Sequence, residues 1–226
     1  MNILAVDTST GSCSVAFLKE RRLIAEEVYT AGKTHSRHLM GIIDHILDRC
    51  EIAPVDLDGI AVTRGPGTFT GLRIGLSTVK GLAAAIEKPV VGVSSLAALA
   101  FPLAWTRKPV VAMIDARRGE IYHARFSGGN GSEPSGTVRV SSPEEAAQAL
   151  PGGAVLAGSG AVLYRKVWES RRPDIRVAHE TAHVIRAASV GMLAMDRFED
   201  GTADPADVLV PEYIRKSDAQ IHMASC

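Results

Sequence analysis

Two aspartates in this sequence lie where a carboxylate could act on a ligand. Asp7 ends a short apolar run at residues 3–7, and Asp115 ends a similar run 108 residues further on. A carboxylate at the end of a strand could hold a magnesium-bound nucleotide. Aspartate in this position also commonly accepts hydrogen bonds from the turn that follows it. The sequence leaves both interpretations open.

A glycine-rich segment, residues 65–81, is the second candidate for chemistry. It opens with Gly65-Pro-Gly67, where a strand is expected to turn into a helix, and backbone N–H groups at such a turn can bind an anion. It is not a Walker A loop, because Gly71 is followed by Leu and Arg rather than by Lys and Ser or Thr. Glycines that supply backbone freedom, with Thr68 as the helix cap, are the favoured explanation.

Histidine and serine residues form no recognisable catalytic set. His35, His38 and His45 suggest a metal site, but His38 and His45 are two helical turns, roughly 10 Å, apart. No carboxylate completes an His-Glu-x-x-His motif. The run Gly158-Ser-Gly160 is too short for a nucleophile elbow. We therefore predict no metal site.

Composition and charge favour a cytoplasmic protein that does not bind nucleic acid on its own. Lys plus Arg number 25 and Asp plus Glu number 25, so no overall field attracts a polyanion. Three widely spaced cysteines exclude a disulfide scaffold and indicate a reducing cytosol. Asp7 ends the first apolar run too early for a signal peptide. Residues 89–106 are uncharged, but Pro89 and Pro102 favour a buried strand and helix over a membrane span.

Hydrophobic periodicity predicts strands and helices in an order that occurs twice. In the first half we expect strands at 3–7, 12–18, 23–29, 59–62 and 90–93, with helices after Thr34 or Ser36, at 69–85 and from about 96. In the second half, strands are expected at 155–157 and 175–178 and helices at 161–170 and 183–198, and Ser142-Pro-Glu-Glu145 predicts a capping box.

The two halves also align in sequence at an offset of 108 residues. Ala5-Val-Asp-Thr-Ser-Thr-Gly11 matches Met113-Ile-Asp-Ala-Arg-Arg-Gly119. In both places a β-type run ends in Asp, turns, and resumes after a Gly four residues later. Together with the shared order of elements, this match favours an ancient duplication.

Six motifs spread over nearly the whole chain are typical of one family. They are Ile3-Leu-Ala-Val-Asp-Thr-Ser9, Thr34-His-Ser36, Gly65-Pro-Gly-Thr-Phe-Thr-Gly-Leu-Arg-Ile-Gly75, Lys80-Gly-Leu-Ala83, Gly92-Val-Ser-Ser-Leu96 and Pro211-Glu-Tyr-Ile-Arg215. Together they resemble the bacterial TsaB (YeaZ) family. The resemblance implies an α/β fold of two related lobes, the two-lobed actin-like ATPase (ASKHA, RNase H-like) fold, in which each lobe is a mixed sheet with flanking helices. We expect an N-terminal lobe at 1–106, a C-terminal lobe at 107–216 and a disordered tail at 217–226.

The resemblance also implies a function in making threonylcarbamoyladenosine beside the anticodon of tRNA. In that family, TsaB is a non-catalytic scaffold that activates its paralogue TsaD, the transferase, and the ATPase TsaE joins them. We expect TsaD, TsaE and a second copy of this chain as partners, with tRNA bound only through the complex. The alternatives are a small-molecule kinase of the same fold and a peptidase.

Departures from the catalytic relatives place ATP and metal on the partner subunits. TsaD-type proteins bind metal through His-x-x-x-His, where this chain has Ser94-Ser-Leu-Ala-Ala98. The phosphate loops of the fold expect Asp-x-Gly, where this chain has Asp7-Thr-Ser and Asp115-Ala-Arg. At most a vestigial nucleotide site is expected, formed by the family motif residues Asp7, Thr8, Ser9, Gly65, Pro66, Gly67, Thr70, Arg73 and Asp115.

The first two long helices are the expected partner surface. Their apolar stripes are wide, and we predict that part of them is exposed and binds TsaD or a second copy, since exposed apolar patches mark interfaces. A stripe of small residues at Gly71, Gly75 and Thr78 would allow close approach of another helix, within the chain or from a partner. The predicted interface residues are Leu39, Ile42, Ile43, Ile46, Gly71, Leu72, Gly75, Leu76, Thr78 and Val79.

Overall fold

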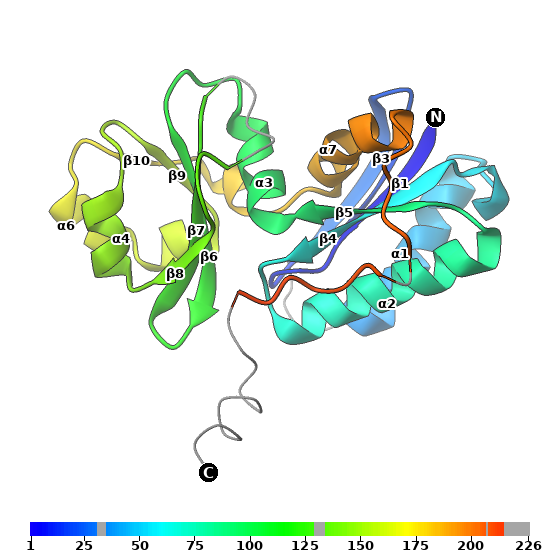
Figure 1. Cartoon of the computed structure of the whole chain (residues 1–226), viewed down its shortest axis with the longest axis horizontal. Helices are drawn as coiled ribbons and strands as arrows, with labels where there is room; N and C mark the ends of the chain where they lie inside the picture. Colours follow the sequence, from blue (N-terminus) through cyan, green and yellow to red (C-terminus); the bar gives the residue numbers. More distant parts are fainter. Residues whose placement is uncertain (31–34, 129–133, 207, 215–226) are drawn as a thin grey trace, which may run out of the picture.

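The chain folds into two lobes, each built on a five-stranded mixed sheet (Figure 1). The structure is a computed structural model, and it describes residues 1–30, 35–128, 134–206 and 208–214. The cap expected at Thr34 and the tail expected at 217–226 lie outside the described residues.

The first sheet has the strand order β3-β2-β1-β4-β5. Strands β1 to β3 form an antiparallel meander, and β4 and β5 run parallel to β1. Helices α1 and α2 cover one face of this sheet, and α7 covers the other (Figure 1). The elements are β1 Asn2–Asp7, β2 Cys13–Lys19, β3 Arg22–Tyr29, α1 His35–Arg49, β4 Gly59–Gly65, α2 Phe69–Ile86, β5 Val90–Ser94 and α7 Ala187–Glu199.

The second sheet repeats this topology with the order β8-β7-β6-β9-β10. Strands β6 to β8 are again antiparallel, and β9 and β10 run parallel to β6. The duplication predicted from the sequence is therefore visible as two sheets of the same connectivity. The elements are β6 Val110–Arg117, β7 Glu120–Phe126, β8 Arg139–Ser141, α4 Pro143–Ala149, β9 Val155–Ala157, α5 Ser159–Leu163, α6 Arg165–Arg171 and β10 Arg176–Val177.

Three apolar clusters form the core. One lies between the two sheets, where α7 and the short helix α3 (Ser95–Ala100) pack together (Figure 1). The second lies between the first sheet and the helices α1 and α2. The third lies on the outer face of the second sheet, around the fully buried Trp168. Most of the uncharged segment 89–106 is buried as β5 and α3, while Trp105 near its end is 81% exposed. No helix of the described residues is long and apolar enough to cross a membrane.

The structure differs from the sequence prediction at two places in the second half. The range 107–216 is not one lobe, because α7 packs on β1, β2, β4 and β5, and Asp204 forms an antiparallel bridge with Val90. The helix expected at 161–170 is two helices, and the one expected at 183–198 begins at Ala187, after the 3-10 turn Glu180–His183. The other 3-10 turns are Pro54–Asp56 and Phe101–Leu103.

Candidate functional site

Asp7 is fully buried at the carboxyl end of β1, where it organises the turn into β2. Its Oδ1 atom accepts hydrogen bonds from the Ser9 backbone N–H (3.1 Å), the Ser9 hydroxyl (2.6 Å) and the Thr63 hydroxyl of β4 (2.7 Å). The turn-capping interpretation of Asp7 is thus the one that these contacts support. Thr63 was missed by the sequence analysis, because nothing in the pattern of β4 marks its hydroxyl as a partner for another strand.

The amino-terminal end of α2 packs directly on this turn. The Thr68 N–H donates to the Ser9 carbonyl (2.7 Å), and the Thr8 hydroxyl donates to the Gly71 carbonyl (2.7 Å). A Cβ atom at Gly71 would lie 2.0 Å from the Thr8 carbonyl oxygen, and one at Gly67 would lie 2.2 Å from that of Ser9. The glycines are therefore required for close approach of helix and turn.

The predicted helix cap of α2 is confirmed. The Thr68 hydroxyl accepts from the Gly71 N–H (3.2 Å), and Thr68 is extended, as expected of an N-cap. Two amides at this helix end thus bind protein groups, which leaves them unavailable to an anion. Gly65 and Pro66, at the start of the loop, are buried. A Cβ atom at Gly65 would lie 2.6 Å from the Glu212 carbonyl oxygen.

The small-residue stripe of α2 belongs to the interior of the first lobe. A Cβ atom at Gly75 would lie 2.4 Å from the Thr8 hydroxyl oxygen, and only Thr78 is partly exposed. Of the two interpretations of Gly71 and Gly75, packing inside the chain is correct. Their use as a contact with a partner helix is excluded by the turn that already covers them.

The predicted exposure of the apolar stripes is also wrong. Their residues are at most 5% exposed: Leu39, Ile42, Ile43, Ile46, Leu72, Leu76 and Val79. All of them except Leu72 belong to the core between α1, α2 and the sheet. A sheet face this apolar needs the whole stripe of each covering helix, so none remains for a partner. Whether the same helices bind a partner through their other face stays a prediction.

The outer face of α1 and α2 carries an exposed glycine on each helix. Gly41 and Gly81 are exposed, and a Cβ atom at either would meet nothing within 4 Å. Ser77 of α2, one helical turn before Gly81, is also exposed, and Met40 of α1 is 52% exposed. This surface, Met40, Gly41, Ser77 and Gly81, is called the outer helix face below.

An aromatic and arginine cluster lies beside it, at the start of α2. The Phe69 and Tyr213 rings stack with centroids 5.4 Å apart, and the Arg73 guanidinium lies 3.9 Å from the Phe69 centroid. The Arg73 Nε–H also donates to the Tyr213 hydroxyl (3.2 Å), while Thr70 is exposed. The i, i+4 spacing of Phe69 and Arg73 could have predicted their contact, but Tyr213 is too distant in sequence.

Asp115 lies in the second lobe and has its own partners. Its Oδ1 accepts from the Arg117 N–H (2.9 Å), and its own N–H donates to the Ser159 hydroxyl (3.0 Å). Like Asp7, it holds the turn that follows the first strand of its sheet. The structure therefore brings Asp7, Thr8 and Ser9 together with the glycine loop, but assigns Asp115 to a separate turn.

Nucleophilic and metal-binding groups are sparse in this region. Burial, and to a smaller extent the charge of Asp7, raises the pKa of the Cys13 thiol to about 11, so this thiol is protonated at neutral pH. His45 pairs with Glu27, and His38 is exposed. Within the described residues, no group of three or more His, Cys, Asp or Glu side chains could hold a metal ion.

The topology and the packed turns define the class of this protein. Two mixed sheets of the same strand order with flanking helices form the two-lobed actin-like ATPase (ASKHA, RNase H-like) fold. A structure of (R)-2-hydroxyglutaryl-CoA dehydratase component A from Acidaminococcus fermentans shares this fold, with a TM-score of 0.56 at 10% identity over 88% of this chain and 99% of that one.

Closer comparisons place the chain within one family of this class. The family model of TsaD, tRNA N6-adenosine threonylcarbamoyltransferase, matches residues 29–223. The tRNA threonylcarbamoyladenosine biosynthesis proteins TsaB of Bacillus subtilis and of Escherichia coli are each 31% identical over 97% of this chain and 96% of their own. The structure of YeaZ from Pseudomonas aeruginosa has a TM-score of 0.82 at 33% identity and covers 94% of this chain and 99% of its own. The chain belongs to the TsaB (YeaZ) family.

Proposed function

We propose that this protein is a non-catalytic subunit in the synthesis of threonylcarbamoyladenosine on tRNA, and that it activates a TsaD-type transferase by binding to it in the cytoplasm. The observation that carries the proposal is the packing of α2 on the Asp7 turn in a member of the TsaB family. The Ser9 carbonyl and the Thr68 hydroxyl accept from the Thr68 and Gly71 amides at the helix end, where a nucleotide-binding member of the fold would need free donors. ATP and metal belong to the partner subunits in this proposal, and tRNA is bound through the assembled complex.

The outer helix face is the surface proposed to bind TsaD. Gly41 and Gly81 would let a partner helix approach closely, and substitution there need not disturb the core, because their Cβ positions are open. A second copy of the chain would use the same face, so the homodimer and the TsaD complex are mutually exclusive. TsaE would join the TsaD complex rather than this chain alone.

A kinase or a peptidase is less well supported by the same residues. A kinase needs donors and a carboxylate free for a magnesium-bound nucleotide, whereas the Asp7 Oδ1 atom is engaged by three donors of the protein itself. A relative from Pseudomonas aeruginosa is described as similar to a peptidase. A peptidase needs a nucleophile or a metal-activated water. Burial raises the pKa of the Cys13 thiol, and among the described residues no group of side chains could hold a metal ion.

Reconstitution with purified components tests the proposal. The chain, TsaD, TsaE and the enzyme that makes the threonylcarbamoyl adenylate should together modify tRNA, and omission of either TsaD or this chain should abolish the reaction. Modification by this chain and the adenylate-forming enzyme alone would overturn the non-catalytic role.

The docking surface is tested by two matched substitutions. Gly81→Arg introduces a long side chain on the outer helix face and should weaken TsaD binding at least tenfold while the protein remains folded. Gly152→Arg is the control, because Gly152 is also exposed but lies in the second lobe, with only an ordinary 3.9 Å contact for its Cβ atom. Equal TsaD affinity for both variants in calorimetric titration would refute docking through this face.

A further inference from the structure

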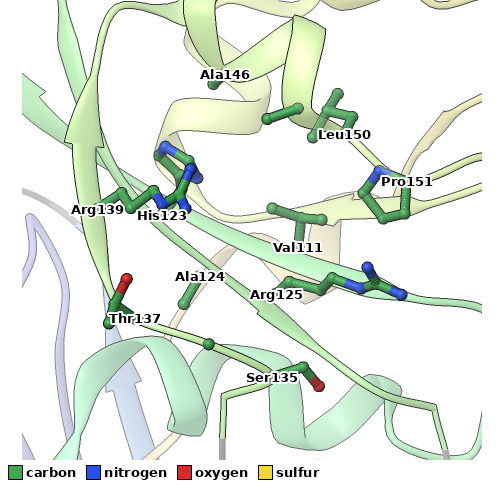
Figure 2. A pocket seen from close by; sticks show the side chains of 12 residues that line it. Val111, His123, Ala124, Arg125, Ser135, Thr137, Arg139, Ala146, Leu150 and Pro151 are labelled. Carbon is green, nitrogen blue, oxygen red and sulfur yellow. The ribbon is translucent and has the colours of Figure 1, made fainter.

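A pocket on the outer face of the second sheet has no part in the function proposed above, and the inference drawn from it does not depend on that function. Its volume is about 170 Å³, and it lies where α4 ends and leaves the sheet uncovered. Val111 of β6 forms its floor, and Leu150 and Pro151 form one wall (Figure 2). His123 and Arg125, two residues apart on β7, project from the same face of the sheet.

The charged groups of the pocket are cationic and lie at opposite ends of the apolar floor. Arg139 is the cross-strand neighbour of His123, and their side chains lie together at one end (Figure 2). The Arg125 guanidinium lies at the other end, near Pro151 (Figure 2). Among the described residues, neither Arg125 nor Arg139 has a carboxylate within 4.0 Å. Arg107, Arg171 and Arg176 are also exposed without a carboxylate partner among the described residues, and what distinguishes Arg125 and Arg139 is that both line the same hollow.

The negative end of α4 does not offset this charge. The carbonyls of Ala147 and Leu150 accept hydrogen bonds from the Arg172 Nη1 atom, at 3.3 and 2.6 Å. Arg172 therefore satisfies two of the acceptors at this helix end and places a further cation there.

A second hollow of about 380 Å³ adjoins the pocket, and His123 and Arg139 line both. The two share Ala146 and Ala149 of α4, so together they approach the size of small-molecule sites. Glu145 is the carboxylate in the lining of this second hollow, and its Oε2 atom accepts from the Ser142 N–H (3.3 Å) in the capping box of α4. Glu145 is thus held at the start of α4, away from the pocket with Arg125.

We propose that this pocket binds a small organic anion, whose short apolar body packs on Val111, Leu150 and Pro151 and whose carboxylate or phosphoryl groups pair with Arg139 and Arg125. Arginine is suited to this because its planar guanidinium binds both kinds of group with two parallel hydrogen bonds. A neutral or cationic ligand would leave both arginines without a counter-charge. A dianion with an apolar spacer satisfies both ends at once.

The ionisation of His123 supplies a readout of occupancy. Burial and the charge of Arg139 lower the pKa of His123, whose Nε2 atom lies 3.0 Å from the Ser141 hydroxyl. The charged groups that face it are Arg139 from β8, Arg125 on its own strand and Glu145 from α4. An anion bound between the arginines offsets their field and raises the pKa of His123. By linkage, the anion therefore binds more tightly as pH falls through this pKa.

The test is a titration of the full chain with three probes, each compared with sodium chloride at the same ionic strength. Glutarate carries two carboxylates on an apolar spacer, butyrate carries one, and inorganic phosphate has no apolar body. The His123 ring signals, assigned with the His123→Gln variant, report binding by NMR. We expect saturable shifts, an upward movement of the His123 pKa, and tighter binding of glutarate than of butyrate. Saturation by phosphate instead would support the anion site and identify a phosphoryl ligand.

Matched variants distinguish binding at the pocket from nonspecific attraction of anions to positive charge. Arg125→Gln and Arg139→Gln should each weaken glutarate binding about tenfold, as expected for loss of one charge-assisted pair. Arg176→Gln is the control, because Arg176 is an exposed arginine of the same sheet that does not line the pocket. The glutarate affinity of this variant should stay within twofold of that of the unmodified chain. Responses to all three probes equal to that of sodium chloride would overturn the proposal, as would equal losses in all three arginine variants.

Discussion

Replacing Gly75 by Ala should destabilise the protein, although alanine is the better helix former. In an open helix interior this change contributes about 1 kcal/mol of stability. At Gly75, however, the new Cβ atom would lie 2.4 Å from the Thr8 hydroxyl oxygen, which must move. The displaced hydroxyl loses its 2.7 Å hydrogen bond to the Gly71 carbonyl, at a cost of about 1 kcal/mol. Overpacking adds about 1 to 3 kcal/mol. The free energy of unfolding of Gly75→Ala should therefore fall by about 1 to 3 kcal/mol.

Gly81 offers the same substitution in the same helix with the opposite sign. A Cβ atom there meets nothing within 4 Å, so Gly81→Ala should raise the free energy of unfolding by about 1 kcal/mol. Urea unfolding of both variants, followed by circular dichroism, measures the two changes under identical conditions. If Gly75→Ala were stabilised as much as Gly81→Ala, the contact between α2 and the Asp7 turn would be absent, and the argument that the glycines serve packing would fail.

Three further substitutions test other parts of the fold. Burial alone would raise the pKa of Asp204, but hydrogen bonds from Arg197 and from the Gly92 N–H lower it below its ordinary value of 3.8. The ionised Asp204 therefore adds to the free energy of unfolding above its ordinary pKa, and this contribution is lost as pH falls through the lowered pKa. Asp204→Asn should reduce the free energy of unfolding at neutral pH by about 1 to 3 kcal/mol and make it less dependent on pH in the acid range. Ser142→Ala, which removes the cap of α4, should cost about 1 kcal/mol in urea unfolding. Trp168→Phe leaves a buried carbonyl without its 3.1 Å donor and should lower the unfolding free energy by about 1 to 3 kcal/mol in the same assay.

Local elements were predictable because each depends on a few neighbouring residues. The strand at 155–157 and the capping box at Ser142 are where the sequence places them, since a short apolar run and an N-cap need no distant partner. The paired topology of the two sheets was foreseen from the alignment of Asp7 with Asp115. These features are determined by spacing of 2 or 3.6 residues and by turn chemistry.

Long-range packing could not be predicted in the same way. The apolar stripe of α1 satisfies the period of a helix whether it faces its own sheet or a partner, so the sequence could not decide between them. Gly191, in the interior of α7, signals a close contact because glycine there costs about 1 kcal/mol. The contact itself is with Leu18, which a Cβ atom at Gly191 would approach to 2.4 Å. The sequence around Gly191 does not indicate that Leu18 is its contact, or the reverse. The packing of α7 on the first lobe was therefore not predicted.

The duplication explains the glycine loops of both lobes with one physical cause. After β4, Gly67 of the loop and Gly71 of the first turn of α2 lie against the backbone of the Asp7 turn. After β9, the equivalent strand, a Cβ atom at Gly158 would lie 2.2 Å from the Met113 carbonyl oxygen, and Ser159 binds the Asp115 N–H. In each lobe, the loop that follows the parallel neighbour of the first strand therefore closes over the end of that first strand. Side chains at these positions would push the loop away, so the two lobes retain glycine for packing even though their sequences otherwise differ. The glycine pattern of residues 65–81, which could suggest an anion-binding loop in the sequence, serves in the structure to pack α2 on the Asp7 turn, and Gly158 allows the same close approach to β6 in the second half.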